Sequence, residues 1–458
     1  MSSSSPTVLG TENIRKLLIQ YSGPAILAMI ASALYNVIDR VLLGQLVSPY
    51  AISGLSITMP VMNLSAAFGA MIGAGGATLA SIKMGQQDYG DTLKVLGNVT
   101  LMNIVLGIVF MFFGLVFLDE ILYFFGASET TIPYARDFMQ IILTGNVVTH
   151  LYLGLNNVMR STGNPKKAMY VTLLTVVINL VLAIVFIYFF HWGIRGAALA
   201  TILGQAAALV IVVQHFSNKN ALIHFKRSIL KFDMRIVKGI LSIGMSPFVL
   251  NACLCLVVVI INKALYTHGG DLAIGAYGIV NTLLMIFGML VMGLNQGMQP
   301  IAGYNFGARQ YSRVRQVLKI TIICATTVTT FAFLLGEIAP YYMARMFTKD
   351  EELIRITILG LRVCVITFPV VGFQMVTSNF FQSIGKAKKA ILLSSTRQLL
   401  ILIPLLLILP NIFGTIGVFA SIPVADFTSS LLAFILLRRE MKKFSKLKDE
   451  PFIVQQAK

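Results

Sequence analysis

The sequence predicts an all-α integral membrane protein with about twelve transmembrane helices. Apolar residues make up 57% of the chain, charged residues make up 12%, and the mean hydropathy is +0.82. Soluble domains average about 45–50% apolar and about 25% charged residues, so this much apolar surface requires lipid as its solvent. Long stretches such as residues 95–118 and 168–194 also lack Asp, Glu, Lys and Arg. Each can cross the roughly 30 Å hydrocarbon core as a helix, and none alternates like a barrel strand.

Hydropathy divides the chain into candidate spans separated by short polar connections. These spans lie near residues 17–40, 51–80, 95–118, 134–157, 168–190, 196–216, 239–262, 272–300, 318–338, 356–381, 390–410 and 412–437.

The basic residues indicate how the spans are oriented. Connections after even-numbered spans hold 18 Lys and Arg residues, whereas connections after odd-numbered spans hold 4. Because cytoplasmic loops carry an excess of basic residues, we expect the even-numbered connections and both termini in the cytoplasm. We expect the protein in the cytoplasmic (inner) membrane. Topology also explains the net charge of +18, so the interpretation is a chain surrounded by membrane lipid, with no nucleic-acid partner.

The chain contains an internal repeat. Five short landmarks of the first half recur in the second half, always 221 to 223 residues later. They are SGPAI and MSPFV, IDRVL and INKAL, MGQQDY and FGARQY, RSTGNPKKA and FQSIGKAKKA, and WGIRGAALA and FGTIGVFA. Six spans separate the two copies, an even number, so both enter the membrane in the same direction as parallel repeats.

The repeat divides the chain into two lobes. We predict an N-terminal six-helix lobe over residues 1–218, a basic cytoplasmic linker over 219–238, and a C-terminal six-helix lobe with a basic tail over 239–458. Transporters with this plan place their substrate between the two halves, near the bilayer midplane. A duplicated channel or enzyme would share the repeat, so the repeat by itself leaves those classes open.

The landmarks resemble the multidrug and toxic compound extrusion (MATE) family, in its DinF/MepA-like branch, from about residue 15 to about residue 440. The pieces that carry the resemblance are LYNVIDRVLLGQL (34–46), NVMRSTGNPKKAM (157–169), GIRGAALATILGQ (193–205), GMQPIAGYNFGA (297–308), STRQLLILIPLLLILP (395–410) and PVAD (423–426). The resemblance implies a V-shaped two-lobe transporter that exports drugs, often cationic and amphiphilic, as H⁺ or Na⁺ enters. We expect it to act as a monomer without any other cofactor.

Asp39 is the outstanding acidic residue within a span. An ionised carboxylate at the bilayer centre costs about 2.5–3.5 kcal/mol, so it requires a partner or a function. Ser32, Tyr35, Asn36 and Asp39 share one helical face by their i+3 and i+4 spacing. One interpretation is a simple ion pair near the end of span 1. The family resemblance implies the other, in which Asp39 is the coupling-ion residue.

The resemblance also implies partners for Asp39 in the N-terminal lobe. Family members gather the span-1 Asp with a span-5 Asn and a span-6 Thr, which correspond to Asp39, Asn179 and Thr201. This sequence has Ala183 where the family pattern has a second acidic residue. Hard cations prefer several oxygen ligands, usually anionic ones, so H⁺ is favoured over Na⁺, although Na⁺ at Asp39 stays open. Other cavity or gating candidates in this lobe are Tyr35, Asn36 and Gln205.

The C-terminal lobe offers a second group of polar residues. Arg397 lies within the apolar span 11 and requires a buried partner, for which Asp426 in span 12 is a candidate. The pair is interpreted either as a structural ion pair between helices or as part of the substrate cavity. Gln299, near the end of span 8, is a further cavity candidate. No metal site other than a possible Na⁺ site is predicted.

Two other function classes are weighed against export. A flippase for a lipid-linked saccharide or another amphiphile would share the architecture, but it would be expected to carry a more basic central cavity. An integral-membrane enzyme is disfavoured because no span carries paired carboxylates or a His-rich motif, and His150 stands alone. A phosphate-binding GxxxxGK[ST] loop is also absent from the sequence. We therefore predict a transporter and not an enzyme.

Overall fold

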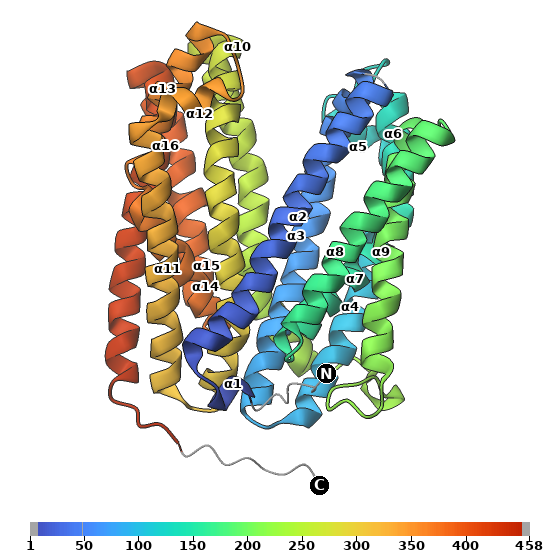
Figure 1. Cartoon of the computed structure of the whole chain (residues 1–458), viewed down its shortest axis with the longest axis vertical. Coiled ribbons are helices and arrows are strands. Elements are labelled where there is room, and N and C mark those ends of the chain that lie inside the picture. The colour runs from blue at the N-terminus through green and yellow to red at the C-terminus, as the bar shows by residue number, and fades with distance from the viewer. Residues whose placement is uncertain (1–7, 48, 451–458) are drawn as a thin grey trace. The chain divides into compact units, whose positions relative to one another are not determined.

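The computed structural model describes residues 8–47 and 49–450. The side chains of residues 36, 37, 40, 41, 43–46, 49, 50 and 52 lie outside that description. Every regular element in the described part is a helix, as Figure 1 shows, which confirms the all-α prediction.

The elements of the first repeat are helices that follow one another with short turns. They are α1 (Val8–Thr11), α2 (Ile14–Leu46), α3 (Pro49–Gly85), α4 (Tyr89–Val116), α5 (Leu118–Phe124), α6 (Ile132–Thr144), α7 (Asn146–Ser161), α8 (Pro165–Ile184), the π-helix η1 (Val185–Phe189), α9 (Gly193–Ser217) and the 3₁₀ turn η2 (Arg227–Ile229). The second repeat contains α10 (Met234–Gly307), α11 (Tyr311–Ile338), α12 (Pro340–Arg345), α13 (Glu351–Val365), α14 (Phe368–Ser383), α15 (Ala387–Ser395), the π-helix η3 (Thr396–Leu402) and α16 (Ile403–Phe444).

The predicted number of spans is confirmed. Eight helical stretches of the described chain are long and apolar enough to cross a membrane, and two bent helix pairs raise this number to ten. Two of the eight reverse at a glycine with positive φ, at Gly270 in α10 and Gly414 in α16. A side chain with a Cβ rarely adopts such a backbone conformation. Each of these stretches therefore makes two passes, which gives twelve.

Spans 4 and 10 are broken, which hydropathy did not predict. The expected span 134–157 consists of α6 and α7, which meet at an angle of 55°, and the expected span 356–381 consists of α13 and α14, which meet at 53°. Pro369 lies in the first turn of α14, where it disfavours continuation of the preceding helix. The other break falls at Gly145, and the residue one repeat later is Thr367, so both repeats bend at the same place.

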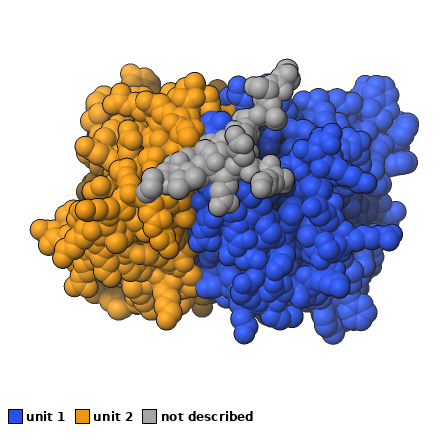
Figure 2. Space-filling view, turned by 90° about the horizontal axis from the view of Figure 1, so that it is seen from below, with its two compact units in different colours: residues 1–9, 27–248, 454–458 blue, residues 10–26, 249–453 orange. Residues whose placement is uncertain are grey.

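The helices form two compact units, which Figure 2 colours separately. Unit 1 contains Leu27–Phe248, and unit 2 contains Gly10–Ile26 together with most of the chain after Phe248. The first turns of α2 thus belong to the unit of the second repeat, and the first turns of α10 belong to the unit of the first repeat.

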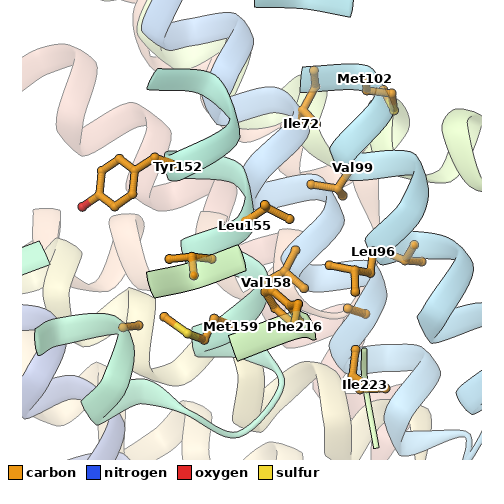
Figure 3. Packing of buried hydrophobic residues seen from close by; sticks show 14 of the residues in the cluster. Ile72, Leu96, Val99, Met102, Tyr152, Leu155, Val158, Met159, Phe216 and Ile223 are labelled. Atoms are coloured by element: carbon orange, nitrogen blue, oxygen red, sulfur yellow. The ribbon is translucent and has the colours of Figure 1, made fainter. Parts of the chain in front are cut away.

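Each unit has its own apolar core. In unit 1, one cluster joins α3, α4, α7 and α9 through residues such as Leu96, Val158 and Phe216 (Figure 3). In unit 2, the corresponding cluster includes Val257, Leu361 and Phe419. Burial of such side chains stabilises each unit by roughly 1.5–3 kcal/mol per residue.

The segment between α9 and α10 is folded onto unit 1. Ile223 and Ile229 are buried in the same cluster as Leu96. The Asn98 amide group donates to the Lys231 carbonyl over 3.3 Å and accepts from the Asp233 amide over 3.0 Å. The predicted basic linker is therefore a packed part of unit 1.

Candidate functional site

Tyr35 and Asp39 lie one turn apart on α2, on the side of the helix that faces into unit 1. Asp39 is 9% exposed, whereas Leu34 and Ile38 on other sides of the same turns are 58% and 38% exposed. The apolar side chains that would meet lipid are thus separated from a polar face. The side chain of Asn36 lies outside the described residues.

The hydroxyl of Tyr35 meets residues from two neighbouring helices, α8 and α9. Asn179 Nδ2 donates to Tyr35 Oη over 3.2 Å and to Thr201 Oγ1 over 3.0 Å. Tyr35 Oη and Thr201 Oγ1 are 3.1 Å apart, and Thr201 Oγ1 also donates to the Ala197 carbonyl. Because Thr201 uses its proton there, Tyr35 is the donor of the Tyr35–Thr201 bond. The three residues form one closed network, which we call the Tyr35 network.

A glycine allows α8 and α9 to approach closely enough for this network. The two helices run side by side in Figure 1. A methyl group on Gly204 would lie 3.0 Å from the Thr175 carbonyl oxygen and 3.4 Å from Asn179 Cβ. Small residues bring membrane helices close together and place polar side chains within hydrogen-bond distance. Gly204, one turn after Thr201, therefore positions Asn179 against Thr201.

Asn179 retains one unused acceptor. The residue is buried, and its Oδ1 has no hydrogen-bond partner among the described residues. The Asp39 carboxylate lies within electrostatic reach of the Tyr35 hydroxyl. The site therefore combines a buried carboxylate, two hydroxyl groups and a free amide oxygen, a set suited to holding and exchanging a proton.

Ala183 lies one turn beyond Asn179 and is surrounded by apolar groups. It is 1% exposed and belongs to a cluster with Ile187, Ile194 and Ala197. The place of a second carboxylate in the family pattern is thus filled by apolar packing. Among the described residues, no group of three or more His, Cys, Asp or Glu could hold a metal ion.

Gln205 and its partner extend the polar face of α9 by one turn. Thr149 on α7 donates from its hydroxyl to Gln205 Oε1. Sequence analysis named Gln205 but missed Thr149. The spacing of Asn146, Thr149 and His150 on one helical face was the available signal.

His150 is a packed residue of unit 1. It is 1% exposed, and its Nε2 lies 3.0 Å from Ser65 Oγ, which donates to Asn146 Oδ1 over 3.2 Å. Ser65 uses its proton on Asn146, so His150 Nε2 is the donor to Ser65.

The polar residues predicted in the second repeat lie in unit 2. Arg397 Nε donates to Asp426 Oδ1 over 2.6 Å, so the expected ion pair is present. Arg397 lies in the π-helix η3, an irregularity that is frequent at functional sites. Gln299 is buried in α10.

Comparison with known proteins matches both repeats. The family described as MatE matches residues 24–185 and 247–408, so its two matches begin at the paired prolines Pro24 and Pro247. A curated relative, the multidrug export protein MepA of Staphylococcus haemolyticus, is 26% identical over 93% of both chains. MepA of Staphylococcus aureus is 25% identical over 92% of this chain and 93% of its own.

Solved structures agree. The MATE multidrug transporter DinF-BH, in complex with a rhodamine dye, is 34% identical with a TM-score of 0.89, covering 96% of this chain and 98% of its own. A MATE family transporter in an outward-facing conformation shares the fold with a TM-score of 0.90 at 21% identity, covering 97% and 99%. The family match to both repeats and the likeness to DinF-BH lead to one conclusion: this chain belongs to the MatE family and is a multi-pass MATE transporter.

Proposed function

We propose that this protein is a multidrug efflux antiporter that exports small organic compounds in exchange for H⁺ by alternating access. The observation that carries the proposal is the buried Asp39 carboxylate beside the Tyr35 network. The names of the relatives support the substrate class, since MepA is a multidrug export protein and DinF-BH was solved with a rhodamine dye. The substrates we propose are drugs and xenobiotics, including cationic amphiphiles.

In the proposed mechanism, Asp39 is the group that binds and releases the coupling proton. Ionised Asp39 in a low-dielectric surrounding is unfavourable by about 2.5–3.5 kcal/mol, so protonation relieves this penalty. A protonated carboxyl becomes a donor, and Asn179 Oδ1 is an acceptor on the same polar face that is not used by described residues. Proton binding therefore changes which hydrogen bonds α2 makes with α8 and α9. Exported drug and incoming proton favour opposite arrangements of these helices.

We favour H⁺ over Na⁺ because of the surroundings of Ala183. A Na⁺ site requires several oxygen ligands. The position one turn after Asn179 is apolar and fully packed. A single carboxylate with hydroxyl and amide partners is sufficient for a proton.

We propose that the protein lies in the cytoplasmic membrane with both termini in the cytoplasm. The excess of basic residues in the connections after even-numbered spans supports this orientation. One chain carries both repeats, so we propose that the monomer transports.

The decisive experiment is efflux of a cationic rhodamine dye from proteoliposomes under separately imposed pH and Na⁺ gradients. We expect wild-type efflux to follow the pH gradient, and Asp39→Asn to reduce the proton-driven rate to that of empty liposomes. Asp39→Glu, which keeps a titratable group, should retain a measurable rate. Asp271→Asn, at an exposed carboxylate, is the matched control and should leave the rate unchanged. Full proton-driven efflux by a folded Asp39→Asn variant, or wild-type efflux that follows neither gradient, would overturn the proposal.

A further inference from the structure

Helices α4 and α11 are the third spans of the two repeats, and they begin in the same way. Tyr89 starts α4 and Tyr311 starts α11, one repeat apart in the MGQQDY and FGARQY landmarks. The residue two positions earlier has a left-handed backbone in both repeats, with φ of 58° at Gln87 and 55° at Arg309. The turns before the two helices therefore have corresponding backbone geometry.

The two turns differ in how they cap the helix that follows. The first four amides of a helix have no partner within the helix, and an Asp at the N-cap position accepts from one of them. In unit 1, Asp88 does so, because its carboxylate accepts from the Asp91 amide over 2.9 Å. The second repeat has Gln310 at that position, and its side chain makes no capping hydrogen bond in the described structure. The second repeat has therefore lost its local cap.

Residues at the end of the described chain occupy this place. Asp449 Oδ1 accepts from the Ser312 amide over 3.0 Å, and Asp449 Oδ2 accepts from the Ser312 hydroxyl. Ser312 is the second residue of α11, and the second or third amide is the one that an N-cap carboxylate accepts from. Asp449 thus makes from a distant part of the chain the contact that Asp88 makes locally.

Neighbouring contacts hold the same segment in place. The Glu450 carboxylate pairs with Arg309, and Gln310 Nε2 donates to the Glu450 carbonyl over 2.6 Å. Gln310, which replaces the capping Asp, therefore binds the segment that supplies the substitute. The opposite charges of Glu450 and Arg309 add to the attraction.

The electrostatics of Asp449 agree with this role. Partial burial raises the pKa of Asp449, but hydrogen bonds from the Ser312 hydroxyl and from the Ser312 and Tyr311 amides outweigh it, so the pKa lies below its ordinary value of 3.8. The carboxylate is therefore charged at neutral pH, where it also interacts favourably with the positive end of the α11 helix dipole. A carboxylate with a lowered pKa stabilises the folded state above its unfolded pKa and loses this effect as the pH falls through the folded pKa.

The turn that Asp449 caps also holds the beginning of α2. Arg313, in the first turn of α11, donates to the Glu12 carbonyl over 2.6 Å and to Asn305 Oδ1 over 2.8 Å. One repeat earlier the residue is Asp91, which pairs with Arg235 at the beginning of α10 over 2.9 Å. In both units the first turn of the third span therefore contacts the start of the first span of the other repeat.

We propose that residues 445–450 are an integral part of unit 2, in which Asp449 is the N-cap of α11 and Glu450 anchors it through Arg309 and Gln310. The C-terminal segment replaces the capping residue that the second repeat lost at Gln310. It is an intramolecular docking surface whose occupant is the acidic pair of this same chain.

The test measures amide exchange in the full-length protein in lipid nanodiscs. We expect Asp449→Ala to raise the exchange rate of the amides of Tyr311 and Ser312 about fivefold, the factor that corresponds to loss of one typical N-cap. Trypsin cleavage after Lys446 should also accelerate because the segment is released. Asp88→Ala is the matched control, and it should raise exchange only at the start of α4.

A second variant separates capping from general damage. Adding Gln310→Asp to Asp449→Ala rebuilds the local cap of the first repeat, so exchange at Tyr311 and Ser312 should return to the wild-type rate. Cleavage after Lys446 should stay fast, because the rebuilt cap does not bind the segment. Unchanged exchange in Asp449→Ala, or raised exchange that Gln310→Asp does not reduce, would contradict the proposal. Neither readout depends on transport, so the outcome is independent of the proposed antiport.

Discussion

At the scale of single residues, Ala183 and Asn179 decide what the polar site of unit 1 can bind. They lie one turn apart on α8, yet Asn179 donates to Tyr35 and Thr201 while Ala183 packs among Ile187 and Ile194. A carboxylate at residue 183 would have to be accommodated by this apolar cluster. The identity of one small side chain therefore bears directly on the choice between H⁺ and Na⁺.

We predict that Ala183→Asp lowers the stability of the protein. An unpartnered carboxylate in the interior of a span should cost about 2.5–3.5 kcal/mol, which should appear as a clear fall in melting temperature in detergent. Ala183→Ser is the control, because its hydroxyl can donate to the carbonyl one turn earlier, and it should change the melting temperature little. If Ala183→Asp melted like wild type and gained stability on addition of Na⁺, the position would be a latent cation site.

At the scale of helices, the first turns of α2 and α10 are held by unusually close crossings. In unit 1, a methyl group on Gly244 of α10 would lie 1.8 Å from the Met71 carbonyl oxygen of α3, and one on Gly75 would lie 2.2 Å from the Ile240 carbonyl oxygen. In unit 2, a methyl group on Gly297 would lie 2.1 Å from Ser22 Oγ of α2. Such small-residue contacts are the main way membrane helices pack tightly.

We predict that Gly244→Ala destabilises the protein, because the nearest atoms are backbone atoms of Met71 that cannot rotate away. Overpacking of this kind costs about 1–3 kcal/mol. Gly278→Ala, also in α10, has no atom within 4 Å of the added methyl group and serves as the matched control. Thermal unfolding of both purified variants measures the difference. Equal melting temperatures would show that α3 and α10 can separate at no cost.

The same scale shows where hydropathy loses information. A window of apolar residues does not distinguish a straight span from two helices that meet at 55°, as α6 and α7 do. Pro369 signalled the break between α13 and α14, but no proline marks the break at Gly145. There, a methyl group would lie 2.4 Å from the Ile202 side chain, so the position of the bend depends on packing against α9.

At the scale of the whole molecule, the distribution of charge predicts the orientation. We expect a single cysteine at Lys349→Cys to react with an impermeant maleimide in intact cells, because this connection follows an odd-numbered span. A single cysteine at Lys219→Cys should react only in inverted vesicles. Both positions are exposed, and the four native cysteines would first be replaced. The reverse labelling pattern would contradict a cytoplasmic location of the termini.

The sequence by itself determined the membrane class, the twelve passes and the duplication. These follow from hydropathy, which is set by local composition, and from landmarks such as Pro24 and Pro247, which need no spatial information. The candidate site was partly accessible in the same way, because Tyr35 and Asp39 share a face by spacing, and the resemblance pointed to Asn179 and Thr201. Their roles in coupling stay a prediction.

Only the tertiary structure decided which of these residues meet. The Tyr35 network depends on the close approach of α8 and α9 at Gly204, and the partner of Gln205 proved to be Thr149, 56 residues earlier. The assignment of the first turns of α2 to unit 2, and the capping of α11 by Asp449, join segments from opposite ends of the chain. Hydrogen bonds and close packing act over a few ångströms in space, and residue spacing along a chain carries no direct record of such contacts.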